Sequence, residues 1–122
     1  MTNSLVNMIM DTSKTDPEVG MGATLLMWSD RAPVTVAKVI RFASGARKGQ
    51  VREIHVVPDT WTVVSGSAHD GSAQYKITPA DLDNADTLRR ASVYRPTNKG
   101  WRSATGNKLS VGTRDVYYDP SF

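Results

Sequence analysis

The sequence contains no cysteine, and it contains only two histidines, His55 and His69. The absence of cysteine excludes disulfides, thiolate metal sites and cysteine nucleophiles together. The two histidines do not form the helical pair that binds a metal ion, and we interpret them as ordinary strand and turn residues. We therefore predict no metal centre and no catalytic residue.

Further absences limit the class of protein. No apolar run approaches the roughly 20 residues that cross a bilayer. Residues 1–10 lack the basic region and the continuous apolar core of a signal peptide. Residues 20–22 contain two glycines, but they lack the preceding strand and the later glycine of a dinucleotide-binding loop. We expect a soluble cytoplasmic protein that is not an enzyme, uses no cofactor and contacts no membrane.

The charges that are present are unevenly distributed along a chain with a formal net charge of +3. Six lysines and arginines lie between Arg31 and Arg52 without an acidic residue among them. Seven more lie between Thr87 and Arg114, again without an acid. Two basic segments of this kind indicate an anionic partner. The alternative interpretation is that these cations cover solvated strand faces.

The length of 122 residues indicates a single domain. Near its start, Leu5, Met8 and Ile9 follow helical spacing and predict a helix over residues 3–12. We assign residues 1–16 to this helix and the start of a linker, and residues 17–122 to one β-rich domain. Because so short a helix is not stable alone in water, its apolar face needs a covering surface.

The rest of the chain alternates apolar and β-branched runs with turn residues. One helical turn is expected over residues 78–82, where Pro79 occupies a favourable first position. The predicted fold class is mainly β with an N-terminal helix (α+β), built as a small antiparallel sheet or barrel. Strands are expected at residues 24–28, 34–40, 51–57, 60–64, 73–77, 88–94, near 101, and at 108–111 and 114–118.

Three places in the sequence could bind an anionic ligand. Arg31 follows Trp28 in a loop bounded by Pro33, where a guanidinium can donate paired hydrogen bonds to phosphate oxygens. Arg114 precedes two tyrosines. The third place combines aromatic rings, an amide and cations, which can stack on bases and hold phosphates. Its residues are Tyr94, Arg95, Asn98, Lys99, Trp101 and Arg102.

Each candidate also has a purely structural interpretation. Arg31 could form a surface ion pair with its neighbour Asp30. Tyr94 and Trp101 could be core residues on neighbouring strands.

Two parts of the chain resemble a family of small phage proteins. The first reads Gly-Met-Gly-Ala-Thr at residues 20–24 and Trp-Ser-Asp-Arg-Ala-Pro-Val-Thr-Val at residues 28–36. The second reads Leu-Ser-Val-Gly-Thr-Arg at residues 109–114 and Tyr-Tyr-Asp-Pro-Ser-Phe at residues 117–122. With these motifs the chain resembles the phage anti-Thoeris sponges at both ends, while its middle diverges from them.

The resemblance implies a β-rich protein with an N-terminal helix that assembles from dimers and binds its ligand between subunits. Members of this family sequester cyclic ADP-ribose isomers, which bacterial TIR-domain immune enzymes make, and some also hold cyclic oligonucleotides. The resemblance thus implies a counter-defence protein in the cytoplasm of an infected bacterium. Its ligand would be a cyclic nucleotide signal that is held without being cleaved.

The resemblance also implies a set of ligand-binding residues. By local motif, Arg31 and Arg114 match the family's ligand-contacting arginines. Asn98 corresponds to an asparagine in a turn, and Tyr94 stands in for the stacking aromatic residue. Trp28 and Arg102 complete the set of candidates.

Tight sequestration requires the ligand to be enclosed. A cyclic ADP-ribose isomer has about 35 heavy atoms, and at roughly 0.3 kcal/mol per atom about 10 kcal/mol of binding free energy is available. Since a small domain encloses a ligand poorly, we expect a homo-oligomer, either a dimer or an assembly such as a hexamer of dimers. On this view Arg114→Ala weakens ligand retention at least about tenfold with little effect on folding. A nucleic-acid-binding module and a phage structural protein are the alternative functions.

Overall fold

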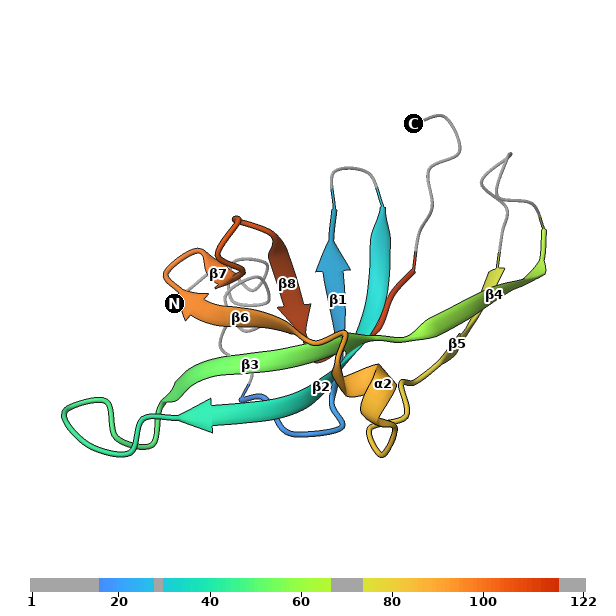
Figure 1. Ribbon diagram of the computed structural model, residues 1–122. Coiled ribbons are helices and arrows are strands. Elements are labelled where there is room, and N and C mark those ends of the chain that lie inside the picture. Colours follow the sequence, from blue (N-terminus) through green and yellow to red (C-terminus); the bar gives the residue numbers. More distant parts are fainter. Residues whose placement is uncertain (1–15, 28–29, 67–73, 117–122) are drawn as a thin grey trace.

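The computed structural model describes residues 16–27, 30–66 and 74–116 (Figure 1). Six antiparallel strands form a closed barrel, and two further strands form a separate two-stranded sheet. The predicted mainly β fold with a small antiparallel barrel is therefore confirmed. The predicted N-terminal helix over residues 3–12 lies outside the described residues, and assembly into an oligomer stays a prediction.

The barrel strands neighbour one another in the order β1, β2, β3, β6, β7, β8, and β8 closes on β1. Their bounds are β1 Gly22–Leu26, β2 Arg31–Arg41, β3 Val51–Pro58, β6 Ser92–Thr97, β7 Gly100–Arg102 and β8 Lys108–Val111. The separate sheet consists of β4 Thr60–Ser65 and β5 Gln74–Thr78.

Every barrel strand contributes side chains to one buried core. Because successive side chains of a strand point to opposite faces, one face of each strand points into this core. In β8, Leu109 and Val111 are buried whereas Lys108 is exposed. The buried cluster comprises Ala23, Val34, Val36, Ile54, Val56, Tyr94, Trp101, Leu109 and Val111.

The helical segment lies later in the chain than predicted. Residues 79–83 are not helical, and the helix of this region is α2, at Ala85–Leu88. The side chain of Asn84 caps α2 by accepting hydrogen bonds from two backbone amides of its first turn. Asparagine is among the favoured N-cap residues, so Asn84 fixes the start of α2.

Two predicted strands are also corrected. Since α2 occupies the start of the predicted strand 88–94, β6 begins only at Ser92. Residues 114–116 form no strand, and the side chain of Arg114 enters a hydrogen-bonded network described below. The rest of that predicted strand, residues 117–118, lies outside the described residues.

Strands β4 and β5 form an arm that extends away from the barrel (Figure 1). Trp61 lies opposite Ile77, and Val63 lies opposite Tyr75, so these four apolar side chains share one face of the arm. The rings of Trp61 and Tyr75 pack edge to face with their centroids 5.2 Å apart. One face of the arm therefore carries an apolar cluster, of which Trp61 and Val63 remain partly exposed.

Asp59, the residue between β3 and β4, anchors the arm to the barrel. Its side chain is fully buried (0% exposed). The carboxylate accepts hydrogen bonds from the Thr35 hydroxyl at 2.6 Å, from the Ala80 amide at 2.8 Å and from Arg114 Nε at 2.9 Å. These donors belong to β2, to the segment after β5 and to the segment after β8. One carboxylate thus joins the barrel, the arm and the C-terminal segment.

Arg114 completes this network. Its Nη2 atom donates to Thr35 Oγ1 at 2.9 Å and to the Gly20 carbonyl at 3.4 Å. Its side chain lies so close to β1 that a Cβ atom at Gly22 would be 2.6 Å from Arg114 Cγ. Glycine is needed at position 22 because the arginine occupies the space of a side chain. The prediction that Arg114→Ala has little effect on folding is therefore revised.

Candidate functional site

A row of cationic side chains runs around the outside of the barrel. Arg95 of β6 lies directly opposite Arg102 of β7, which lies opposite Lys108 of β8. Lys108 lies opposite Leu26 of β1, and Leu26 lies opposite Arg31 of β2. Directly opposed residues of antiparallel strands point to the same face of a sheet. We call Arg95, Arg102, Lys108 and Arg31 the cationic row.

The buried core fixes the outward direction of this row. Trp101 lies opposite Leu109, and both side chains are buried. Their chain neighbours, Arg102 and Lys108, must therefore point outward. The row brings together cations from both of the acid-free segments of the sequence.

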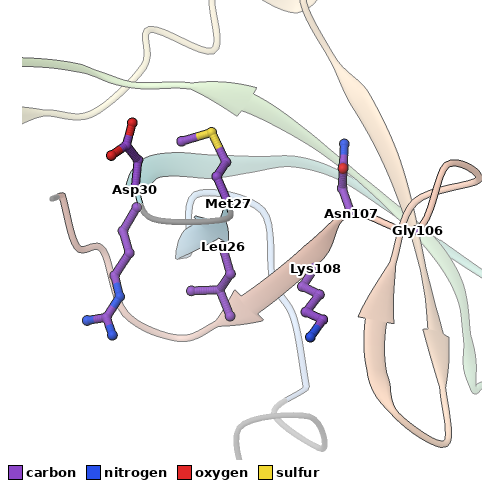
Figure 2. Close-up of a pocket in the computed structure, with 7 residues that line it drawn as sticks. Leu26, Met27, Asp30, Gly106, Asn107 and Lys108 are labelled. Atoms are coloured by element: carbon purple, nitrogen blue, oxygen red, sulfur yellow. The ribbon is translucent and has the colours of Figure 1, made fainter. Parts of the chain in front are cut away.

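One end of the row borders a pocket of about 610 Å³ (Figure 2). The pocket lies between the β1–β2 connection and the β7–β8 connection, which the pairing of β1 with β8 holds together. Its volume is within the range of about 300–1,000 Å³ that is typical of small-molecule sites. The described residues that line it are Leu26, Met27, Asp30, Arg31, Gly106, Asn107 and Lys108.

The lining combines three kinds of chemistry. Arg31 and Lys108 supply positive charge, and the half-exposed Met27 (47%) supplies apolar surface. Asn107 supplies an amide. Leu26 and Lys108 extend to the same side of the sheet (Figure 2), so a ligand there can meet an apolar surface and a cation together.

Arg31 retains donors for a ligand although it is paired. Its Nη1 donates to Asp115 Oδ2 at 2.9 Å, and both side chains are more than half exposed (57% and 51%). Such an exposed pair contributes little to stability. Because a guanidinium carries five N–H donors, one carboxylate contact leaves others for phosphate oxygens.

The structure places the other predicted residues in different environments. Arg102 lies beside the pocket, opposite Lys108, with Nη1 donating to the Trp101 carbonyl at 3.1 Å. Arg114 faces the Asp59 network, and within the described chain it does not line the pocket. The resemblance implies that Arg31 and Arg114 both contact the ligand. Within the described residues of a single chain, the two arginines do not line the same pocket.

Tyr94 is a core residue, with 2% of its surface exposed. Burial raises the pKa of its phenol. A ring in the core cannot stack on a ligand at the surface, so we remove Tyr94 from the proposed site. Asn98 lies exposed in the turn between β6 and β7, and Trp28 lies outside the described residues.

Sequence reasoning did not select Lys108, Asn107 or Met27. Lys108 and Asn107 are far from Arg31 in sequence, and only the pairing of Leu26 with Lys108 brings them together. The available signal was the second acid-free basic segment, which contains Lys108. That segment indicates charge, but it does not say which of its cations meet the first segment.

Glu53 lies at the other end of the row. Its side chain is 12% exposed, and its carboxylate accepts a hydrogen bond from His55 Nε2 at 2.8 Å and one from Arg95 Nη2 at 3.5 Å. The His55 hydrogen bond lowers the pKa of Glu53 against the opposing effect of burial, and the charges of Arg95, His55 and Arg52 lower it further. Glu53 therefore stays ionised and limits the positive charge at this end.

Within the described residues, no group of three histidine, cysteine or acidic side chains could hold a metal ion. The described helical segment is too short to span a membrane. A scan against models of protein families, a search of curated proteins and a search of solved structures each gave no match to this chain.

Proposed function

We propose that the pocket beside Arg31 and Lys108 binds a phosphate-bearing cyclic nucleotide and holds it without cleaving it. The observation that carries the proposal is the meeting of these two cations with the apolar side chain of Leu26 in one pocket, which Met27 and Asn107 line from the other side (Figure 2). The cations suit phosphate oxygens, and the apolar surface suits the face of a base. The amide of Asn107 can hydrogen-bond to either a base edge or a sugar hydroxyl.

The two cations supply part of the free energy that sequestration needs. Each charge-assisted hydrogen bond from Arg31 or Lys108 to a phosphate contributes roughly 1.5–3 kcal/mol. A pocket of about 610 Å³ accommodates a ligand of the size of a cyclic ADP-ribose isomer. With the resemblance at both ends of the chain, this supports a role as a phage counter-defence sponge for cyclic ADP-ribose isomers in the host cytoplasm.

The proposal includes a second copy of the chain. The pocket lies on the outside of one barrel, where water screens the cations and weakens their hold on a ligand. A partner subunit that closes over the pocket would exclude this water. We expect the purified protein to behave as a dimer or larger in analytical ultracentrifugation, and a monomer at the concentration where ligand binds tightly would contradict this part of the proposal.

Calorimetric titration with cyclic ADP-ribose isomers tests the site. We expect Lys108→Ala to weaken binding at least about tenfold, since it removes a charge-assisted phosphate contact. Lys48→Ala, which removes the same charge from the exposed β2–β3 turn, is the matched control and should bind like the unaltered protein. Equal binding by both variants would remove Lys108 from the site.

A further inference from the structure

We propose that the cationic row binds the sugar–phosphate backbone of a single-stranded nucleic acid on the outside of the barrel. This site goes beyond the nucleotide pocket, because half of the row, Arg95 and Arg102, does not line that pocket. The proposal rests on the strand register and on the exposure of the row. The row shares Arg31 and Lys108 with the pocket, so the oligonucleotide is tested in the absence of a cyclic nucleotide.

The register gives the row its length. From Arg95 to Arg31 the row crosses from β6 through β7, β8 and β1 to β2. At roughly 4.8 Å per neighbouring strand, the path is about 19 Å along the barrel wall. A stacked single strand advances about 3.4 Å per phosphate, so about five phosphates lie along that path. The row thus matches a chain of phosphates better than a single phosphate group.

The shape of the barrel selects a single strand over a duplex. The row spans five of the six strands of a closed barrel, so it curves around the molecule. Duplex DNA is stiff over about 150 base pairs and would touch only a short part of such a curve. A single strand is flexible enough to follow it. Since the side chains of the row are cationic and not aromatic, it should hold the backbone without reading the bases.

The cations of the row are available to phosphates. Arg95 is 58% exposed and reaches Glu53 only at 3.5 Å. Lys108 is exposed, and among the described residues its amine forms no ion pair. Arg102 donates one hydrogen bond to a backbone carbonyl and keeps its remaining donors. Phosphate oxygens can therefore add to these contacts without first breaking a buried ion pair.

The test is the salt dependence of binding to a fluorescent oligothymidylate of about 12 nucleotides, a length within the usual range of single-strand sites. Four phosphate contacts predict a loss of affinity of about 50-fold between about 50 and 200 mM salt. With Arg95→Ala and Arg102→Ala combined, the loss should fall to about 7-fold, and affinity at low salt should drop at least about tenfold.

Two control variants make the result decisive. Arg47→Ala with Lys48→Ala removes the same charge from the β2–β3 turn, outside the row, and should leave the salt dependence unchanged. Arg95→Lys with Arg102→Lys keeps the charge and should restore most of the affinity. If the turn variant and the row variant lose the same amount of affinity for the oligonucleotide, the proposal is overturned. The absence of oligonucleotide binding at low salt would also overturn it.

Two further outcomes separate this proposal from others. Tighter binding of a duplex of equal length would overturn the assignment to a single strand. Arg95→Ala alone, at a residue that does not border the pocket, should still retain the cyclic nucleotide, so a weakened binding of the oligonucleotide alone identifies the row. If the unaltered protein binds the oligonucleotide but no cyclic nucleotide, the proposed function fails and the inference about the row stands.

Discussion

At the scale of single residues, Arg114 carries a structural role. Its Nε contacts a fully buried Asp59 carboxylate at 2.9 Å. Removing the arginine would leave that charge buried without its cationic partner. We expect Arg114→Ala to lower the free energy of unfolding by about 3 kcal/mol, measured by urea denaturation.

Arg89→Ala is the matched control for this variant. Arg89 pairs with Asp86 at 3.1 Å, but both side chains are about four-fifths exposed (79% and 82%). Its loss should change the free energy of unfolding by less than about 0.5 kcal/mol. Equal effects of the two substitutions would show that the Asp59–Arg114 contact does not hold the fold together.

Glu53 should make stability depend on pH in the acidic range. The pKa of Glu53 is lowered below its ordinary value of 4.5 in the folded protein, chiefly by the hydrogen bond from His55. A lowered folded pKa means that the carboxylate stabilises the fold above the ordinary value, and that this stabilisation is lost as the pH falls through the folded value. Thermal denaturation should therefore show a fall in Tm below about pH 4.5.

Glu53→Gln should flatten this acidic part of the Tm profile, because the glutamine cannot titrate. It should also lower Tm near neutral pH, where the carboxylate is lost as a partner for His55 and Arg95. An unchanged acidic slope in this variant would assign the pH dependence to other carboxylates.

The sequence indicates residue chemistry better than residue position. Arg31 could be selected because the sequence around it shows turn residues and a recognisable motif, although the predicted loop is wrong at this point, since Arg31 and Pro33 both lie in β2. Lys108 could not be selected from the sequence, because its role depends on lying opposite Leu26, which is more than half the chain away. Arg114 shows the reverse case, because its motif pointed to a ligand while its side chain faces a buried carboxylate.

At the scale of elements, the arm should open independently of the barrel. All side chains of β4 are exposed, and a two-stranded sheet alone is marginally stable in water. We expect backbone amides of β4 and β5 to exchange hydrogen at least about tenfold faster than those of the central β2–β3 pairs. Protection of the arm equal to that of β2 and β3 would contradict this and would show that another surface covers its apolar face.

Strand positions were predictable because β1, β2 and β3 consist of apolar and β-branched runs bounded by turn residues, and because β8 alternates exposed or half-buried with buried residues. The position of α2 was not predicted, because Asn84 had to be recognised as the stronger cap. The arm was predicted as two ordinary strands. Nothing in the sequence states that β3 and β4, separated by one residue, belong to different sheets.

At the scale of the whole molecule, closure of the barrel creates the candidate site. Pairing of β1 with β8 joins two segments that are far apart in the sequence and places Arg31 and Lys108 around one pocket. The composition predicted two basic segments. The closure of the barrel and the register of its strands bring cations of both segments into one row. These long-range pairings depend on packing of the whole core and could not be read from local patterns.

The most direct test of the central claim is recovery of the ligand. The purified protein is mixed with a cyclic ADP-ribose isomer, freed of unbound ligand by gel filtration and then heated to denature it. The released molecule is identified by mass spectrometry. The account predicts that the isomer is retained by the unaltered protein, returned chemically intact, and lost from the Lys108→Ala variant during filtration. Failure of the unaltered protein to retain the isomer, or release of a cleaved product, would contradict it.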